Sequence, residues 1–503
     1  DANTTGNDNT AIGDAALGAN TTSNGNTAVG SAALTDNTTG ANNVAVGYLA
    51  ADANTEGTEN VAIGKSALTT NTTANANTAV GFNALALNTT GASNVAIGKD
   101  ALDSNTTASN NVAVGVDALQ ANTTGASLVG IGLSALAANT TANDNIAIGS
   151  EAMVANTTGT GNIAIGPNAL DANTTASSNI AVGPAAIGSN TTGANNVAVG
   201  KEALEANTTA DNNTAMGHKA LEANTTGANN TGIGYIALNV NTTGSQNTAV
   251  GSFALGVATT ASYNSAFGYQ ALDTNTTGNQ NTAVGRRALY LNTTGSDNTA
   301  VGMNCMDSNT TGNYNVAMGQ GALNNQTTGS NNTIIGYTAG TALTTSTEHV
   351  ALGSGTLAAA TTTAGNVAIG YNALNECTVG STTAVGYEAL GACTSGAGNT
   401  AIGKDACQLT TTGSYNTVIG QLAVITLRLV EKHYRNVLFQ TIPQLVISVW
   451  KKQPQETTTL RLVTHLWMPI LQGLTTQQLV KHHLERLQQE IITQPLVIRL
   501  VEI

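Results

Sequence analysis

Asn94-Val95-Ala96-Ile97-Gly98 decides the fold, because close copies of this pentad recur at a fixed interval along the chain. Asn77-Thr78-Ala79-Val80-Gly81 precedes it and Asn111-Val112-Ala113-Val114-Gly115 follows it, both at that same interval. The complete repeat reads N-(T/V)-A-(V/I)-G-x-x-A-L-x-x-N-T-T-(G/A)-x-x, and we number its positions slot 1 to slot 17 from the first Asn. From Asn9 to Asn416 there are 25 copies, with one residue lost before Thr382.

A short fixed period predicts an elongated array in which each copy contacts only its neighbours. The 17-residue unit is too short for a pair of helices. Slots 2 and 4 hold Val, Ile or Thr, which favour strands, Gly at slot 5 permits a corner, and N-T-T at slots 12–14 forms a second short extended stretch. The pattern therefore predicts an all-β fold, a parallel β-solenoid or β-roll, with two short strands per circuit. Its 25 circuits, or rungs, would span about 120 Å at about 4.8 Å per rung.

The side chains of successive strand residues point to opposite faces, so slots 2 and 4 share one face and the Ala of slot 3 has the other. We assign the larger Val and Ile side chains to the interior and the Ala to the outside. The Ala-Leu pair at slots 8 and 9 adds a second apolar anchor. The Asn residues of slots 1 and 12 are expected to stack on those of the next copy and form ladders of side-chain amides.

The charge of the repeat array excludes several partners. The whole chain has 503 residues and a net charge of −13, and residues 1–420 contain 7 Lys or Arg against 24 Asp or Glu. An acidic surface of this kind does not suit nucleic acid or anionic lipid. No apolar run approaches the roughly 20 residues that a membrane helix needs. We therefore expect neither nucleic-acid binding nor membrane insertion.

The domain boundary is predicted at Gly420, where the composition changes. Residues 1–420 are the 17-residue-repeat solenoid. Within 421–503, pentads such as Ile442-Pro443-Gln444-Leu445-Val446 and Thr459-Leu460-Arg461-Leu462-Val463 recur at the interval of the repeat. The codons AAC ACT GCG GTT GGT encode N-T-A-V-G, and reading them one nucleotide late gives T-L-R-L-V. We therefore interpret 421–503 as repeat DNA translated out of frame and assign it no domain. Resequencing the gene tests this, because a one-base shift must restore N-T-A-V-G units.

The array also resembles known repeats. N-V-A-I-G and N-T-A-V-G at short fixed spacing resemble the head repeats of trimeric autotransporter adhesins. The longer unit N-T-A-V-G-x-x-A-L-x-x-N-T-T-G is similar to repeats of phage tail-fibre and related bacterial surface proteins. The resemblance covers residues 3–420 and implies a left-handed β-roll that forms a homotrimer, with the slot-2 and slot-4 side chains inside. It also implies a location outside the cell, on the cell surface or on a virion.

No constellation of residues indicates chemistry. There is no Ser/His/Asp or Cys/His set, no phosphate-binding loop, no zinc spacing and no calcium nonapeptide, so we predict no enzyme, no catalytic residue, no cofactor and no metal. Asp103, Asp144 and Asp171 share no slot systematically and are interpreted as solvated loop residues. Cys377 and Cys393 replace the slot-12 Asn of adjacent copies, which predicts either an inter-rung disulfide or two free thiols.

These features favour an extracellular structural fibre, spike or adhesin shaft, homotrimeric, whose partners are its own copies and a host-surface glycan or receptor. One alternative is a subunit of an end-to-end extracellular filament. Another is an ice-binding solenoid, because the first Thr of each N-T-T repeats as a row that includes Thr72, Thr89 and Thr106. N-T-T also matches the N-glycosylation acceptor, which is an alternative to the Asn ladder.

Overall fold

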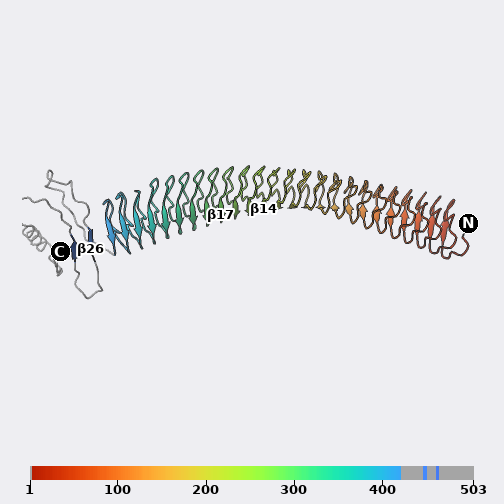
Figure 1. Cartoon of the computed structure of the whole chain (residues 1–503), viewed down its shortest axis with the longest axis horizontal. Coiled ribbons are helices and arrows are strands. Elements are labelled where there is room, and N and C mark those ends of the chain that lie inside the picture. The colour runs from red at the N-terminus through yellow and green to blue at the C-terminus, as the bar shows by residue number, and fades with distance from the viewer. Residues whose placement is uncertain (1–2, 421–445, 450–459, 464–503) are drawn as a thin grey trace, which may run out of the picture. The chain divides into compact units, whose positions relative to one another are not determined.

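The computed structural model describes residues 3–420, 446–449 and 460–463. The chain divides into two compact units, Asp1–Thr311 and Gly312–Ile503. In the first unit the strands lie side by side, and the chain completes one circuit between consecutive strands (Figure 1). Each strand has three residues and covers slots 2–4 of one copy.

The first unit contains the first eighteen strands. They are β1 (Thr10–Ile12), β2 (Thr27–Val29), β3 (Val44–Val46), β4 (Val61–Ile63), β5 (Thr78–Val80), β6 (Val95–Ile97), β7 (Val112–Val114), β8 (Val129–Ile131), β9 (Ile146–Ile148), β10 (Ile163–Ile165), β11 (Ile180–Val182), β12 (Val197–Val199), β13 (Thr214–Met216), β14 (Thr231–Ile233), β15 (Thr248–Val250), β16 (Ser265–Phe267), β17 (Thr282–Val284) and β18 (Thr299–Val301).

The second unit continues the repeat. Its repeat strands are β19 (Val316–Met318), β20 (Thr333–Ile335), β21 (Val350–Leu352), β22 (Val367–Ile369), β23 (Thr383–Val385), β24 (Thr400–Ile402) and β25 (Thr417–Ile419). Two further strands, β26 (Val446–Val449) and β27 (Leu460–Val463), pair antiparallel. The rest of 421–503 lies outside the described residues, and so does the prediction of an out-of-frame origin.

Within each unit, consecutive strands pair in parallel and in one register. Ala96 of β6 lies opposite Ala113 of β7, and the same offset of one full repeat recurs in every pair except β22 and β23, where Val367 lies opposite Thr383. Hydrogen bonds between circuits continue beyond the strands, as where the Leu102 N–H donates to the Ala118 carbonyl at 2.9 Å. One copy therefore forms one circuit of a parallel β-solenoid, as predicted, and the described residues contain no helix.

The second strand predicted for each circuit is wrong, because N-T-T forms a bend. The N–H groups of Thr89 and Thr90 donate to the same acceptor, the Thr106 carbonyl, at 2.8 and 3.3 Å. Two successive N–H groups therefore point the same way, whereas successive residues of a strand point in opposite directions. The segment still binds the next circuit, but it lacks strand geometry.

The slot-5 glycines stack in a column within each unit, as predicted. Gly98 has a φ of +138°, and a Cβ atom placed on it would lie 2.3 Å from the carbonyl oxygen of Gly115 in the next circuit. Both the backbone conformation and the close approach therefore require Gly. The turn uses left-handed residues other than Gly as well, including Leu102 with a φ of 53°. That conformation costs roughly 1–2 kcal/mol, which the complete burial of the Leu102 side chain offsets.

The predicted orientation of the strand is inverted. Ala96 in slot 3 is fully buried, whereas Ile97 in slot 4 is 40% exposed, and the middle residue is the buried one in every strand from β2 to β24. The reason is the narrow interior of the circuit. Gly130 and Gly232 occupy slot 3 in two copies, and a Cβ atom added at Gly130 would already lie 3.0 Å from Cγ of Leu119, the slot-9 residue of the preceding copy. A Val or Ile does not fit beside Leu, so the Val and Ile side chains point outward.

In one circuit the large side chain is in slot 3 and the small residue is in slot 9, which supports this explanation. Ile334 occupies slot 3 and is fully buried, and in the same copy slot 9 holds Gly340 in place of Leu. A Cβ atom on Gly340 would lie 3.3 Å from Cγ2 of Ile334 and 2.8 Å from Cδ1 of Leu343. A large side chain in slot 3 is therefore accommodated where the slot-9 residue is Gly and has no side chain. The exchange keeps the core volume constant.

The Asn ladders are present inside the circuits. Asn105 in slot 12 donates from Nδ2 to Oδ1 of Asn88 at 2.8 Å and to the Ala108 carbonyl at 3.0 Å. Asn94 in slot 1 donates to the same carbonyl at 2.9 Å, and its backbone N–H donates to Oδ1 of Asn77 at 2.9 Å. These amides are fully buried. The ladders therefore satisfy polar groups inside a core that has few large apolar side chains.

Candidate self-association surface

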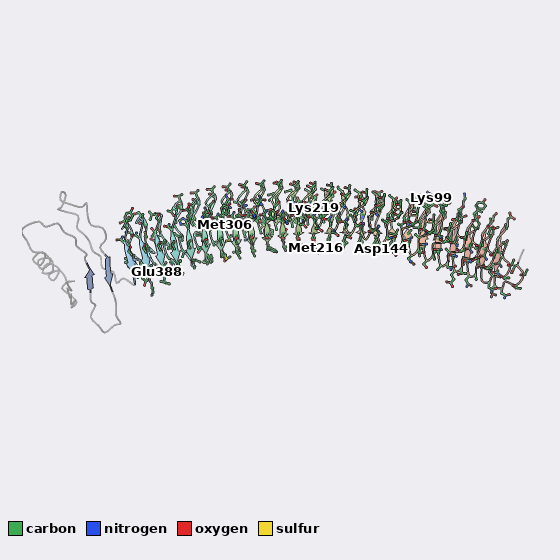
Figure 2. All side chains as sticks on the ribbon, in the orientation of Figure 1. Lys99, Asp144, Met216, Lys219, Met306 and Glu388 are labelled. Carbon is green, nitrogen blue, oxygen red and sulfur yellow. The ribbon has the colours of Figure 1, made fainter. Side chains whose placement is uncertain are left out.

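The outward side chains of slots 2 and 4 form a stripe along each unit, which we call the apolar stripe. Its slot-4 members are the more exposed, as at Ile97 (40%) and Met216 (43%). Figure 2 labels Met216 together with Met306, a slot-9 residue that is fully buried. The contrast shows that the apolar stripe is separate from the core, which is formed by slots 3, 8 and 9.

No copy places a charged residue in the apolar stripe. All 25 slot-4 residues are Val, Ile, Leu, Met or Phe, and all 25 slot-2 residues are Val, Ile, Thr or Ser. The core does not require this, because these side chains point away from it. Other outward positions vary freely, as where slot 6 holds Lys99, Val116 or Ser150. A contiguous apolar surface with this uniformity is typical of an interaction surface.

Aromatic residues form a column in slot 6, just beyond the glycine corner. In the first unit, His218 stacks on Tyr235 with ring centroids 5.6 Å apart, and Phe253 in slot 7 lies edge-on to Tyr235 at 5.4 Å and to Tyr269 at 6.1 Å. Tyr235 and Tyr269 remain 49% and 46% exposed. Tyr235 and Tyr269 are the exposed members of these four residues, the aromatic column, which spans four successive circuits.

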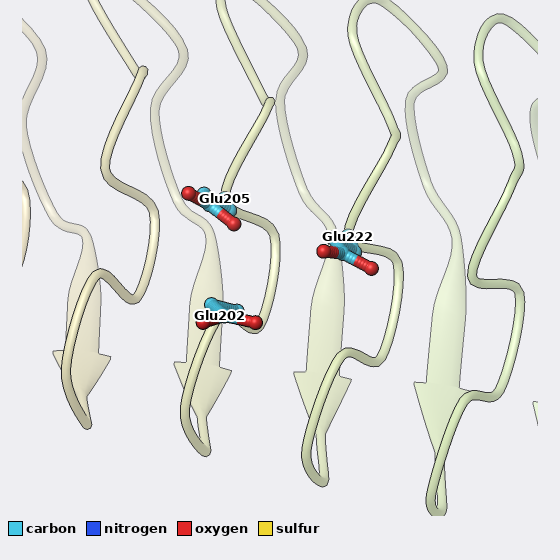
Figure 3. Close-up of side chains that lie close together, drawn as sticks. All are labelled: Glu202, Glu205 and Glu222. Atoms are coloured by element: carbon cyan, nitrogen blue, oxygen red, sulfur yellow. The ribbon is translucent and has the colours of Figure 1, made fainter.

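One acidic cluster lies on the surface of the first unit. Glu202 and Glu205 belong to one circuit and Glu222 to the next (Figure 3). Lys219 Nζ lies 3.2 Å from Glu202 and 2.7 Å from Glu222, so its ammonium group already supplies the neutralising charge. Hydrogen bonds from Lys201 and Lys219 lower the pKa of Glu202, whereas burial and the neighbouring carboxylates raise that of Glu205. The cluster is therefore part of a surface salt-bridge network.

The interpretation of the aspartates as scattered needs correction. Asp103 and Asp171 occupy slot 10 of their copies and are half-buried, whereas Asp144 occupies slot 17 and is exposed. Burial raises the pKa of Asp103 and of Asp171 above the usual range. Asp100 adds to the shift at Asp103 and Glu151 to that at Asp171, but among the described residues neither aspartate belongs to a group of three candidate ligands. The Asp171 carboxylate also accepts the Ala172 N–H at 3.1 Å.

His349 is a titratable residue that lies inside its circuit. It replaces a slot-1 Asn, is fully buried, and reproduces both hydrogen bonds of the amide. Its Nδ1 accepts the Asn366 N–H at 3.1 Å, which leaves Nε2 as the donor to the Thr363 carbonyl at 3.0 Å. Burial lowers the pKa of His349. The imidazole is therefore a neutral structural substitute for Asn.

The cysteines fall into two groups. Cys377 and Cys393 are fully buried free thiols whose Sγ atoms lie 3.9 Å apart on adjacent circuits, so the structure brings the predicted pair together. Whether they form a disulfide remains a prediction. Cys305 is also fully buried, and burial raises its pKa to about 12. Cys407 is half-buried.

The N-T-T segment uses its polar groups internally. Asn105 is buried, and its Nδ2 atom, the one that would carry a glycan, donates two hydrogen bonds. The Thr89 hydroxyl donates to the Thr106 carbonyl at 3.0 Å, and this bond recurs along the row of first threonines. These donors are already used between circuits, which favours the ladder over glycosylation of the folded chain.

Comparison with known proteins gives no assignment, because no protein-family model, curated protein or solved structure matches this chain. Among the described residues there is no helix with the length and hydropathy needed to cross a lipid bilayer. The surface of the solenoid itself is therefore the basis for proposing a function.

Proposed function

We propose that the protein is an extracellular structural fibre, spike or adhesin shaft in which copies of the chain associate along the apolar stripe as a homotrimer. The observation that carries the proposal is the absence of charge from slots 2 and 4 in all 25 copies, although these side chains point away from the core. A parallel β-solenoid with repeated side chains offers the same surface at every circuit. Two aligned copies would therefore match along their length.

Simple energetics explains why such an interface needs many circuits. A fully buried Val or Ile side chain contributes about 1.5–3 kcal/mol, and Ile97 is 40% exposed. Covering what remains exposed would contribute about 1 kcal/mol per circuit. Association costs on the order of 4–15 kcal/mol, so one or two circuits would not associate. The 18 strands of the first unit together exceed that cost.

Native mass measurement of the full chain tests the proposal. The wild-type protein is expected to have the mass of three chains. Lys substitutions at Ile97, Ile131 and Ile165, each in slot 4 and 36–40% exposed, place three charges in the apolar stripe and are expected to give single chains. A variant that keeps the wild-type mass would show that the stripe is not the interface.

The matched control places the same charges elsewhere on the same circuits. Thr107, Thr141 and Thr175 occupy slot 14 of the copies that contain the three Ile residues, and all three are exposed. Lys substitutions at these positions change the net charge equally and are expected to leave the mass at three chains. Dissociation of this control would show that the loss of trimers does not report on the apolar stripe.

The alternative assemblies give different results in the same measurements. An end-to-end filament subunit would give a broad distribution of high masses instead of one value, and long threads in negative-stain micrographs. An ice-binding solenoid would show thermal hysteresis, which a structural fibre lacks. The internally bonded Thr89 hydroxyl favours the fibre, because that row has few free donors for ordered water.

The aromatic column favours a glycan as the external partner. The exposed side chains of Tyr235 and Tyr269 lie two circuits apart, or about 9.6 Å at the usual strand spacing, and amphipathic aromatic rings of this kind combine apolar contact with a polar hydroxyl. Pyranose rings stack their apolar faces on such surfaces. Ala substitution of both tyrosines is expected to abolish binding to a glycan array, while substitution of the distant Tyr48 is expected to leave it unchanged.

A further inference from the structure

The second unit lacks the slot-12 ladder that runs through the first. Slot 12 is Asn in nearly every copy of the first unit, where Ala258 is the exception among the complete copies. In the second unit none of the slot-12 residues is Asn; they are Gln326, Leu343, Ala360, Cys377, Cys393 and Thr410. This part of the solenoid therefore needs another connection between circuits at the same place.

Cys377 and Cys393 occupy slot 12 of consecutive circuits, 16 residues apart. Their Sγ atoms lie 3.9 Å apart, and both residues are fully buried. The neighbouring backbone holds the two circuits together, because the Thr378 N–H donates to the Thr394 carbonyl at 3.2 Å. A disulfide requires Sγ atoms about 2.05 Å apart, a difference that rotation of the two side chains can supply.

We propose that Cys377 and Cys393 are oxidised to a disulfide that replaces the missing Asn ladder and joins the two circuits covalently. The oxidant is a small-molecule disulfide or the disulfide of an oxidoreductase. The thiolate of Cys393 attacks one sulfur of the oxidant and displaces a thiolate. Cys377 then attacks Sγ of Cys393 in the mixed disulfide and displaces the second thiolate. The two cysteine protons pass to the two displaced thiolates, so the cysteines are oxidised as the external disulfide is reduced.

In the closed solenoid the two sulfurs are in contact with each other and with the backbone. The Cys377 thiol lies within hydrogen-bonding distance of Cys393 Sγ, and this contact lowers the pKa of Cys393 and raises that of Cys377. The sulfur of Cys393 also lies 3.3 Å from the Gly396 carbonyl. The closed circuits therefore hold Cys377 beside Cys393 Sγ, the atom that it attacks in the second step.

Burial determines when the bond can form. Neither side chain has exposed surface in the closed solenoid, so an external disulfide reaches them only while these circuits are open, either during folding or in local unfolding. Once formed, the disulfide is shielded from reducing agents by the same burial. The inference is independent of self-association, because both cysteines belong to one chain.

The test is peptide mapping of the full chain after refolding in the presence of oxidised glutathione and alkylation of the remaining thiols under denaturing, non-reducing conditions. The expected product is one cross-linked peptide pair that contains Cys377 and Cys393 and weighs two hydrogens less than the separate peptides, with Cys305 and Cys407 alkylated. Alkylation of all four cysteines, or cross-linking that involves Cys305 or Cys407 instead, would overturn the proposal.

A second measurement follows the effect of the bond on the folded chain. Amide exchange in the second unit is expected to slow on oxidation by roughly a hundredfold, the change expected for closing a loop of this size in the unfolded state. The Cys377→Ser and Cys393→Ser double variant should exchange at the rate of the reduced protein under both conditions. The control variant, Cys305→Ser, should retain the redox dependence. Equal exchange in the oxidised and reduced wild-type protein would contradict the structural role.

Discussion

Replacing Asn105 with Ala removes one step of the slot-12 ladder and gives the most informative test of how the circuits are held together. Asn105 donates to Asn88 Oδ1 at 2.8 Å and to the Ala108 carbonyl at 3.0 Å, and it accepts from Asn122 Nδ2 at 3.2 Å. The variant loses all three bonds. It leaves Asn88 Oδ1 buried without this donor, whereas Asn122 Nδ2 keeps its bond to the Gly125 carbonyl.

The expected loss follows from these bonds. A hydrogen bond within a protein contributes about 1 kcal/mol net, so the three together give a loss of about 3 kcal/mol. The first unit already contains one such interruption, because Ala258 occupies slot 12 and the preceding Asn241 has an Oδ1 with no partner. The variant should therefore fold and be weakened locally. Asn105→Asp should lose more, because a buried carboxylate would face two acceptor oxygens.

Hydrogen exchange followed by mass spectrometry resolves the effect by circuit. Peptides within 88–122 should exchange on the order of a hundredfold faster, the ratio that corresponds to about 3 kcal/mol. Peptides within 180–214 should be unchanged, because stability in a repeat array depends on nearest neighbours. Thr107→Ala, an exposed change two residues away, is the control and should have little effect. Equal exchange in wild type and Asn105→Ala, or a uniform change along the chain, would refute this account of the ladder.

Three further predictions concern other positions. Acidification should loosen the circuit of His349. Burial lowers the pKa of His349 in the folded state, so the unfolded state binds the proton first as the pH falls. The contribution of His349 to folding stability is therefore complete above the usual His pKa of about 6.5 and is lost as the pH falls through that value. Amide exchange compared at about pH 7.5 and about pH 5 measures this, and His349→Asn should remove the dependence. Ala258→Asn should raise local stability by about 1 kcal/mol, because it gives Asn241 Oδ1 a donor; urea titration checks it, and a loss would show that the amide does not fit. Gly98→Ala should open the corner, because its Cβ atom would lie 2.3 Å from the Gly115 carbonyl; limited proteolysis should then cut near residue 98, and full resistance would contradict the stacked column.

The repeat period, the parallel register, the glycine column and the Asn ladders could all be predicted from the sequence. Each of these features follows from a residue type that the same slot requires in every circuit. Gly98 needs a positive φ beside the next Gly, and Asn105 can bond to another Asn only if copies lie in register. Because these requirements recur at one interval, the repeat period by itself predicts how many residues form one circuit. The slot positions of Cys377 and Cys393 in the sequence likewise predict that these two residues lie on adjacent circuits.

The direction of the strand side chains could not be obtained from alternation. Alternation groups slots 2 and 4 on one face, but it does not say which face is inside, and hydrophobicity alone favours Val and Ile. The volume of the circuit decides, because Leu119 already fills the space against slot 3. One signal was present in the sequence, since the copy with Ile334 in slot 3 has Gly340 in slot 9. That exchange of sizes shows that slots 3 and 9 share the core.

The location of the apolar stripe in the assembled protein tests the central claim most directly. Cryo-electron microscopy of the purified full chain would show which surface surrounds the slot-4 side chains. We predict a homotrimer in which Ile97 of each chain lies against slot-2 or slot-4 residues of another chain. Single chains with Ile97 in contact with solvent, or assemblies joined through any other face, would contradict the account.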